Sequence, residues 1–246
     1  MNTNQTLPVE RLTFASPEAL AHAAATAWLD AIEAAHRAGT RHCVALSGGR
    51  ITQKFLATAA DLAQQRGTVF THVHFFWADE RCVPPTDAES NYHLANEFFF
   101  QKMPGISPTQ IHRLIGEQTA QVAVEMAEEE LRRIGAPGKD GQPVLDLIFL
   151  GMGEDGHVAS LFPNAGREVW DCPANFLAVE NSPKPPPRRI TLSFHALVGA
   201  RQVWTLVSGK GKDAALRESL LPGGRTPLGR VLQARSATRI FVDFDL

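Results

Sequence analysis

The chain has 246 residues, of which 44% are hydrophobic and 20% are charged, and its formal net charge is −2. A chain of this length can bury a full core, so the composition excludes a disordered protein and a small disulfide-stapled scaffold. The near-zero charge gives no general attraction to nucleic acid or to anionic membranes, and we expect neither as a partner.

The three cysteines, Cys43, Cys82 and Cys172, are far apart and form no CxxC pair. This spacing is typical of reduced thiols in a cytoplasmic protein. The chain contains no apolar stretch of the roughly 18 residues that a transmembrane helix needs. Its first residues, MNTNQTLPVERLTF, contain neither the basic nor the apolar region of a signal peptide, so we expect a cytoplasmic location.

Apolar runs of strand length alternate with segments of helical period along the chain. In order, the sequence predicts a helix over 16–36, a strand over 42–46, a helix over 51–65, a strand over 73–77, a loop over 78–89, a helix over 90–100, a short strand over 111–115 and a helix over 119–134. A loop over 136–143 follows, then strands over 145–150, 176–179, 190–194 and 203–207, a helix over 212–220 and a strand over 239–244.

Most of these strands are apolar throughout, which is typical of a parallel sheet covered by helices on both faces. Together with the alternating helices, this pattern predicts an α/β fold: a doubly wound, mainly parallel, Rossmann-like sheet. Ligands of such sheets bind beyond the carboxyl ends of the strands. The loops that follow Leu46, Trp77, Leu150 and Val207 are therefore the candidate site.

The loop after Leu150 reads GMGEDGH and contains the pattern GxGxxG. A dinucleotide site requires these glycines to open a helix, and Pro163 leaves room only for a short one, so we disfavour that function. Asp155 and His157 in the same loop indicate acid–base chemistry, because a histidine held beside a carboxylate can exchange a proton near pH 7. A hydrogen-bonded loop histidine without a chemical role is the alternative.

The other three loops offer backbone amides and charges. Ser47, Gly48 and Gly49 precede a helix and can bring N–H groups to an anion, although a plain tight turn is equally compatible. Asp79 and Arg81 follow one strand directly, and Lys210 and Lys212 lie between glycines after another. Each set is either solvated surface or a binding site for a phosphorylated ligand. If it is a binding site, we expect Asp79 to hold a cation in place. We assign no role to His72, His74, His93 and His195 and predict no metal site.

Six segments in order resemble the 6-phosphogluconolactonase family over nearly the whole chain. They are LSGG at 46–49, FFWADERCVP at 75–84, ESNYHLA at 89–95, LDLIFLGMGEDGHVASLFP at 145–163, RRITLSFHAL at 188–197 and VSGKGKDAAL at 207–216. The resemblance implies a fold similar to glucosamine-6-phosphate deaminase. It also implies hydrolysis of 6-phospho-D-glucono-1,5-lactone to 6-phospho-D-gluconate in the oxidative pentose phosphate pathway, without a cofactor.

The resemblance assigns roles by position. His157 corresponds to the catalytic base and Asp155 to its neighbour. The substrate-binding residues correspond to Ser47, Gly48, Gly49, Asp79, Arg81, Arg189 and Lys212, with Lys210 as a possible substitute for Lys212. Because these residues extend from 47 to 212, we expect a single domain over 1–246. The sequence leaves the oligomeric state open.

One position departs from the family pattern, and two rival functions remain. Arg50 stands where the family usually has a small hydroxyl residue, so its contact with the phosphate is left open. An amino-sugar-phosphate deaminase or isomerase has a glutamate where this chain has Phe162, and ring opening needs that extra acid–base group, which favours the lactonase. A sugar-phosphate sensor without activity is the second rival, although it need not keep His157 and Asp155.

Overall fold

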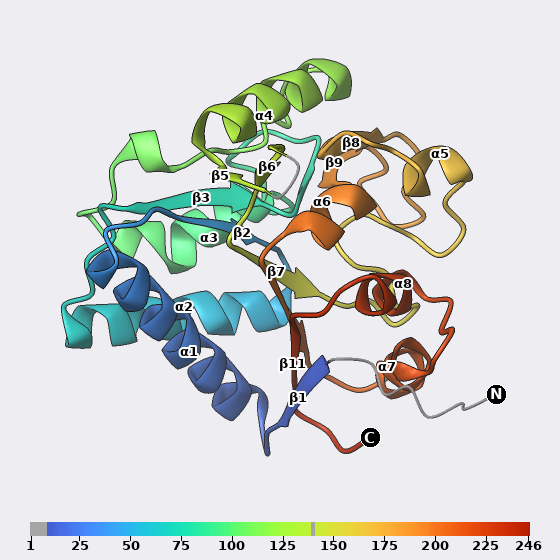
Figure 1. Cartoon of the computed structure of the whole chain (residues 1–246), viewed down its shortest axis with the longest axis horizontal. Helices are drawn as coiled ribbons and strands as arrows, with labels where there is room; N and C mark the ends of the chain where they lie inside the picture. Colours follow the sequence, from blue (N-terminus) through green and yellow to red (C-terminus); the bar gives the residue numbers. More distant parts are fainter. Residues whose placement is uncertain (1–8, 139–140) are drawn as a thin grey trace.

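The computed structural model describes residues 9–138 and 141–246 of the chain. Its main sheet has the strand order β1-β11-β10-β7-β2-β3, and every neighbouring pair is parallel. These strands are β1 (Val9–Thr13), β2 (His42–Leu46), β3 (Val73–Trp77), β7 (Leu147–Gly151), β10 (Gln202–Val207) and β11 (Thr238–Val242). Figure 1 shows α1 and α2 on one side of this sheet and α6, α7 and α8 on the other. The predicted doubly wound α/β class is confirmed.

The strands at the centre of the sheet follow the sequence prediction closely. β2 and β3 have the predicted bounds, and all five residues of β2 are buried. Helices on both faces exclude water from these strands, which explains why their sequences are apolar apart from His42 and His74. The helix α1 (Pro17–Arg37) begins as predicted, because the Ser16 hydroxyl accepts a hydrogen bond from the Ala19 N–H.

An aromatic cluster packs α1 and α2 (Arg50–Arg66) onto the sheet. Trp28 of α1 is fully buried, and its ring lies 5.5 Å from the rings of both Phe55 and Phe149. Phe55 belongs to α2 and Phe149 to β7, so the cluster joins both helices to a central strand. Large aromatic side chains contribute much of the free energy of core packing. The cluster therefore fixes α1 and α2 against one face of the sheet.

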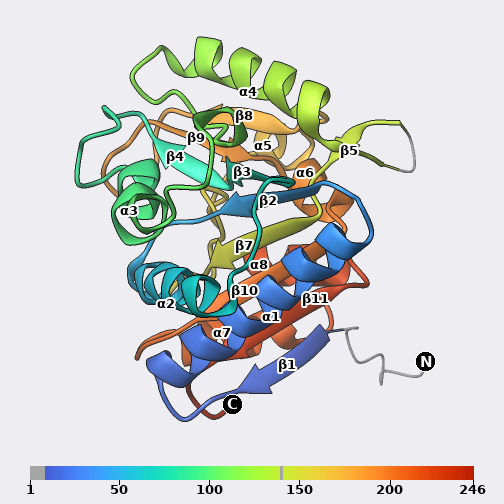
Figure 2. The ribbon, with the colours of Figure 1, turned by 90° about the vertical axis from the view of Figure 1, so that its left-hand side faces the viewer.

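A second, antiparallel sheet is the main departure from the prediction. It has the order β4-β9-β8 and consists of β4 (Asp79–Arg81), β8 (Phe176–Val179) and β9 (Arg189–Leu192). The prediction of a loop over 78–89 is therefore wrong for residues 79–81. β4 contains three charged residues, and only its pairing with β9 makes it a strand. Figure 2 shows this sheet beneath α4 (Ala120–Ile134), which packs on β8.

Four other predicted segments differ in detail. At 111–115, only Ile111 forms an isolated bridge, to Phe75, and no strand follows. The loop predicted over 136–143 contains β5 (Ala136–Pro137) and β6 (Pro143–Val144), while 139–140 lie outside the described residues. The strand predicted over 190–194 ends earlier because the Ser193 hydroxyl caps α6. The last strand, predicted over 239–244, ends at Val242.

The remaining helices cover the edges and the second face. They are α3 (Asn91–Phe98), the short 3-10 helices η1 (Phe100–Lys102) and η2 (Pro108–Gln110), α5 (Arg167–Trp170), α6 (Phe194–Gly199), α7 (Asp213–Leu220) and α8 (Pro227–Gln233). The sequence did not predict α5 or α8. Within 9–138 and 141–246, no helix is long and apolar enough to cross a membrane. The signal-peptide prediction concerns a segment whose residues 1–8 lie outside the described ranges.

Candidate active site

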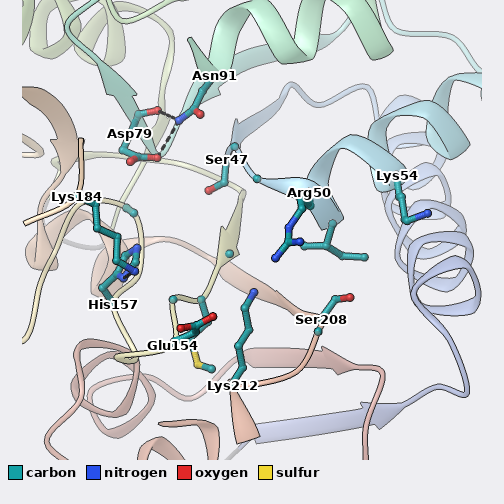
Figure 3. Close-up of a pocket in the computed structure, with 18 of the residues that line it drawn as sticks. Ser47, Arg50, Lys54, Asp79, Asn91, Glu154, His157, Lys184, Ser208 and Lys212 are labelled. Carbon is teal, nitrogen blue, oxygen red and sulfur yellow. Dashed lines mark hydrogen bonds between the residues drawn. The ribbon is translucent and has the colours of Figure 1, made fainter. Parts of the chain in front are cut away.

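A cavity of about 750 Å³ opens where the carboxyl ends of the central strands meet the second sheet. Figure 3 shows the side chains that point into it. It is lined by Pro17, Ser47, Gly48, Gly49, Arg50, Ile51, Lys54, Asp79, Arg81, Asn91, Gly151, Met152, Gly153, Glu154, His157, Ala159, Lys184, Arg189, Ser208, Gly209, Lys210 and Lys212. Every predicted site residue except Asp155 is in this set. All four predicted loops therefore meet at one pocket.

The loop between β2 and α2 forms one wall. The buried Ser47 donates a hydrogen bond of 2.7 Å from Oγ to the Phe149 carbonyl, so its hydroxyl ties the loop to β7. Gly49 is the N-cap of α2 at φ +103, and no side chain within the described ranges caps this helix end. No acidic residue lies in the first turn, which starts with Arg50. The helix therefore presents free N–H groups and its positive dipole end, a combination that favours anions.

β4 and β9 form the opposite wall. Arg81 and Arg189 are directly opposed in the antiparallel register, and Asp79 shares their face because side chains alternate along a strand. The buried Asp79 carboxylate accepts hydrogen bonds from the Ser160 hydroxyl at 2.7 Å and from the Asn91 amide at 3.1 Å. Its Oδ2 lies 3.7 Å from Arg189 Nη1. Asp79 thus lies beside the Arg189 guanidinium and accepts a hydrogen bond from Asn91.

The two arginines differ in their partners. Arg81 Nη1 donates to the Glu89 carbonyl at 2.7 Å and lies 3.3 Å from the Glu89 carboxylate, while its buried Nε has no partner among the described residues. Arg189 is 3% exposed, and its guanidinium donates to the backbone carbonyls of residues 184, 185 and 186. Arg189 therefore fixes the segment before β9, and Arg81 keeps one donor, Nε, that no described residue engages.

His157 and Asp155 lie on the glycine-rich loop after β7. Asp155 Oδ1 lies 2.5 Å from His157 Nδ1, and because a carboxylate only accepts, Nδ1 carries the proton and Nε2 is the free base. A Cβ on Gly153 would overlap the imidazole, so a glycine is needed there. Gly153 N–H donates to the His157 carbonyl, closing the loop without the helix that a dinucleotide site requires.

Burial and charge set the protonation state of this pair. Burial lowers the pKa of His157, and Asp155 opposes this by hydrogen bond and charge without reversing it. For Asp155, burial raises the pKa, but the hydrogen bond and charge of His157 together with the charge of Lys184 outweigh it and lower the pKa. His157 is therefore neutral and Asp155 ionised at neutral pH, which suits a general base.

The loop after β10 supplies the last cation. Burial lowers the pKa of Lys212, and the charge of Arg50 lowers it further. Figure 3 shows the Lys212 ammonium and the Arg50 guanidinium pointing into the same part of the pocket. Lys210 also lines the pocket but is exposed, whereas Lys212 is half-buried. Lys212 and Arg50 are thus two cations directed at one space.

Sequence reasoning missed several lining residues. Asn91 and Glu154 lie within motifs that the sequence singled out, but neither was assigned a role. Lys184 lies in the stretch PKPPPRR, whose only sequence signal is its bias toward proline and basic residues. The pocket does not include His72, His74, His93 or His195. Within the described parts of the chain, no group of three or more His, Cys, Asp or Glu residues can hold a metal ion.

Known proteins of similar sequence and structure point to one family. A sequence model of the family described as glucosamine-6-phosphate isomerases/6-phosphogluconolactonase matches residues 15–240. A 6-phosphogluconolactonase from Mycobacterium tuberculosis is 36% identical over 220 residues, covering 87% of this chain and 86% of that protein. The structure of 6-phosphogluconolactonase from Trypanosoma brucei superposes with a TM-score of 0.82 at 26% identity, covering 95% of both chains.

A more distant structure shares the fold alone. A monomeric glucosamine-6-phosphate deaminase superposes with a TM-score of 0.77 at 18% identity, covering 96% of both chains. Three findings favour the lactonases over the deaminase. The sequence identity to the lactonases is higher, the family model matches most of the chain, and the segment at 151–163 reads GMGEDGHVASLFP. The chain therefore belongs to the 6-phosphogluconolactonase family, within the wider group that includes the glucosamine-6-phosphate isomerases.

Proposed function

We propose that this protein hydrolyses 6-phospho-D-glucono-1,5-lactone to 6-phospho-D-gluconate, the second step of the oxidative pentose phosphate pathway. The observation that carries the proposal is the His157–Asp155 pair, placed in a pocket that Arg50, Arg81 and Lys212 also line. The base suits hydrolysis of an uncharged ester group, and the cations suit a phosphate carried by the same molecule. The names of the family relatives support the same reaction.

In the proposed mechanism, His157 acts as the general base. Its free Nε2 takes a proton from a water molecule, and the water oxygen attacks the C1 carbonyl of the lactone. The protonated imidazole then donates this proton to the ring oxygen as the C1–O bond breaks. Asp155 orients the ring and stabilises its positive charge. A placed base contributes roughly 10²–10⁴-fold in rate, and the lactone also opens slowly without an enzyme, so no metal or covalent intermediate is part of the proposal.

We place the substrate phosphate between the start of α2 and Lys212. The Ser47–Gly49 loop, the free helix end and Lys212 support this position, and Arg50 points into the same space. The sequence alone favoured Arg81 and Arg189 as phosphate ligands as well. In the present proposal they stay in the binding set, but on the opposite wall and nearer the ring. Arg81 Nε supports this role because it is buried without a partner among the described residues.

Phe162 favours the lactonase over an amino-sugar-phosphate deaminase or isomerase. Its ring is 5% exposed and lies 4.8 Å from the His157 ring, at a tilt of 35°. The rival reactions need a second acid–base group beside the histidine, whereas Phe162 offers only an apolar surface. Hydrolysis of an ester needs one base and a water molecule.

The direct test is acid release from freshly generated 6-phosphogluconolactone, with the spontaneous rate subtracted. We expect wild-type protein to accelerate hydrolysis and His157→Ala to lose nearly all of the acceleration while still binding 6-phosphogluconate. Wild-type-like turnover by His157→Ala would remove this residue from the mechanism. Binding without any acceleration by the wild type would favour the sensor and overturn the proposal.

The remaining sequence expectations stay predictions. The reaction as proposed requires no cofactor, nucleic acid or membrane, and we keep the cytoplasm as the expected location. We also keep the proposal that 1–246 form one domain, because the pocket takes residues from 17 to 212.

A further inference from the structure

Lys184 approaches the His157–Asp155 pair from a distant part of the chain. Its Nζ lies 3.5 Å from His157 Nδ1 and 3.8 Å from Asp155 Oδ1. Because Nδ1–H already donates to Asp155 and an ammonium only donates, the Lys184–His157 contact is one of charge and not a hydrogen bond. Figure 3 shows the Lys184 side chain lying against the imidazole.

The backbone that carries Lys184 is firmly held. Arg189 Nη2 donates to the Lys184 carbonyl at 3.1 Å and to the Pro185 carbonyl at 3.2 Å, and Arg189 Nε donates to the Pro186 carbonyl at 3.1 Å. The Ser182 hydroxyl donates to the Lys184 carbonyl at 2.8 Å and accepts from its N–H at 3.2 Å. A buried arginine and a proline-rich segment thus limit the conformations from which Lys184 reaches the pair.

We infer that Lys184 is a positioning residue that completes a Lys–Asp–His charge chain and keeps the His157 imidazole neutral and ready to accept a proton. The inference rests on the proposed function for its catalytic meaning. Without Lys184, the full negative charge of Asp155 would act on His157 and favour the protonated imidazole, which cannot act as a base. With Lys184 present, part of that charge is neutralised and Asp155 still orients the ring.

The other groups around His157 do not replace this effect. Asp155 contacts it from its own loop, and the carboxylate of Asp79 on β4 also favours the protonated ring. The Phe162 ring packs against the imidazole. The Arg189 guanidinium lies 5.9 Å from the centre of the Phe162 ring and donates to the carbonyls before β9. Among these neighbours, Lys184 is the cation whose charge lowers the pKa of His157.

The test compares Lys184→Met and Lys184→Arg with Lys54→Met as a matched control. Lys54 lines the same pocket but pairs with Glu18 at 2.7 Å. The first readout is an NMR titration of His157, whose ring signal is identified by its absence in His157→Gln. The second is the pH profile of lactone hydrolysis, with the spontaneous rate subtracted at each pH.

We expect Lys184→Met to move the His157 titration and the acid limb of kcat/KM together to higher pH. The Lys184 side chain is 45% exposed, so its charge is screened, and the loss at pH 5.5 should be roughly 1.5- to 5-fold, with rates converging above pH 8. Lys184→Arg should restore the limb, and Lys54→Met should leave it in place.

Three results would overturn the inference. The first is a His157 titration that does not change in Lys184→Met. The second is an equal loss of rate at every pH, which would make Lys184 a substrate ligand instead. The third is the same shift in Lys54→Met, which would show only the general field of the pocket. If wild-type protein does not hydrolyse the lactone, the proposed function fails, while the NMR titration still decides the Lys184–His157 coupling.

Discussion

Gly48 lies at the contact between the two walls of the pocket. A Cβ built on it would overlap Asn91 Oδ1 and lie 2.6 Å from Asn91 Cγ. Asn91 is 3% exposed and cannot easily turn aside, because its Nδ2 donates to the Asp79 carbonyl at 2.8 Å and to the Asp79 carboxylate at 3.1 Å. In Gly48→Ala, either Asn91 leaves Asp79 or the loop before α2 moves by about 1 Å.

Both responses have a measurable cost. Loss of the Asn91 hydrogen bonds leaves a buried carboxylate undersatisfied, which destabilises the fold by roughly 2–4 kcal/mol. Movement of the loop displaces the proposed phosphate site, and an error of this size costs up to about 10²-fold in rate. We therefore expect Gly48→Ala to lower the free energy of unfolding, kcat/KM or both, as measured by urea denaturation and steady-state kinetics.

Two controls isolate the contact. Gly105→Ala adds the same methyl group where, apart from its chain neighbours, no described atom lies within 4 Å, so it should lower neither quantity. Asn91→Ala removes the atoms that the new Cβ meets, so adding Gly48→Ala to Asn91→Ala should cost little more than Asn91→Ala alone. The reasoning is refuted if Gly48→Ala behaves like Gly105→Ala, or if the two substitutions at the contact are simply additive.

Two further predictions concern the walls themselves. Lys212→Ala and Arg81→Ala should each raise KM roughly 10-fold or more with a smaller change in kcat, because the proposed role of both residues is to bind the substrate and not to transfer a proton; an unchanged KM in both would contradict the proposed binding set. Glu80 is buried and accepts hydrogen bonds from three backbone N–H groups and the Ser90 hydroxyl. Glu80→Gln would turn an NH₂ group toward these donors, and we expect a loss of roughly 2–4 kcal/mol in urea unfolding; an unchanged unfolding midpoint would contradict this role.

The parallel sheet was predictable because burial acts on each strand separately. β2 and β3 lie between two layers of helices, so most of their positions favour an apolar residue whatever the neighbouring strand is, and only His42 and His74 depart from this pattern. The helix boundaries were predictable for a similar reason, since Ser16 and Thr119 cap their helices through local hydrogen bonds. Local chemistry thus determines most of the main sheet and the loops at its carboxyl edge.

β4 was not predictable, because its residues form a strand only through distant partners. Asp79 and Glu80 are both buried, and their charges are accommodated by hydrogen bonds from Ser160, Asn91 and other donors remote in sequence. No local pattern distinguishes this arrangement from a solvated polar loop. Arg81 and Arg189 are opposed because of the β4–β9 register, so the sequence suggested both residues but not that they are opposite one another.

The charge available to a ligand in the pocket depends on which cations already have internal partners and not on the net charge of the chain. Lys54 pairs with Glu18, Arg81 lies beside Glu89, and Arg189 is engaged with backbone carbonyls and Asp79. In contrast, no ion pair of the described ranges involves Arg50 or Lys212, and both lie at the uncapped start of α2 or face it. A dianion placed there meets two cations and free amides and displaces no internal carboxylate. The net charge of −2 conceals this local excess, which is why the phosphate belongs at the start of α2 in our proposal and not beside Arg189.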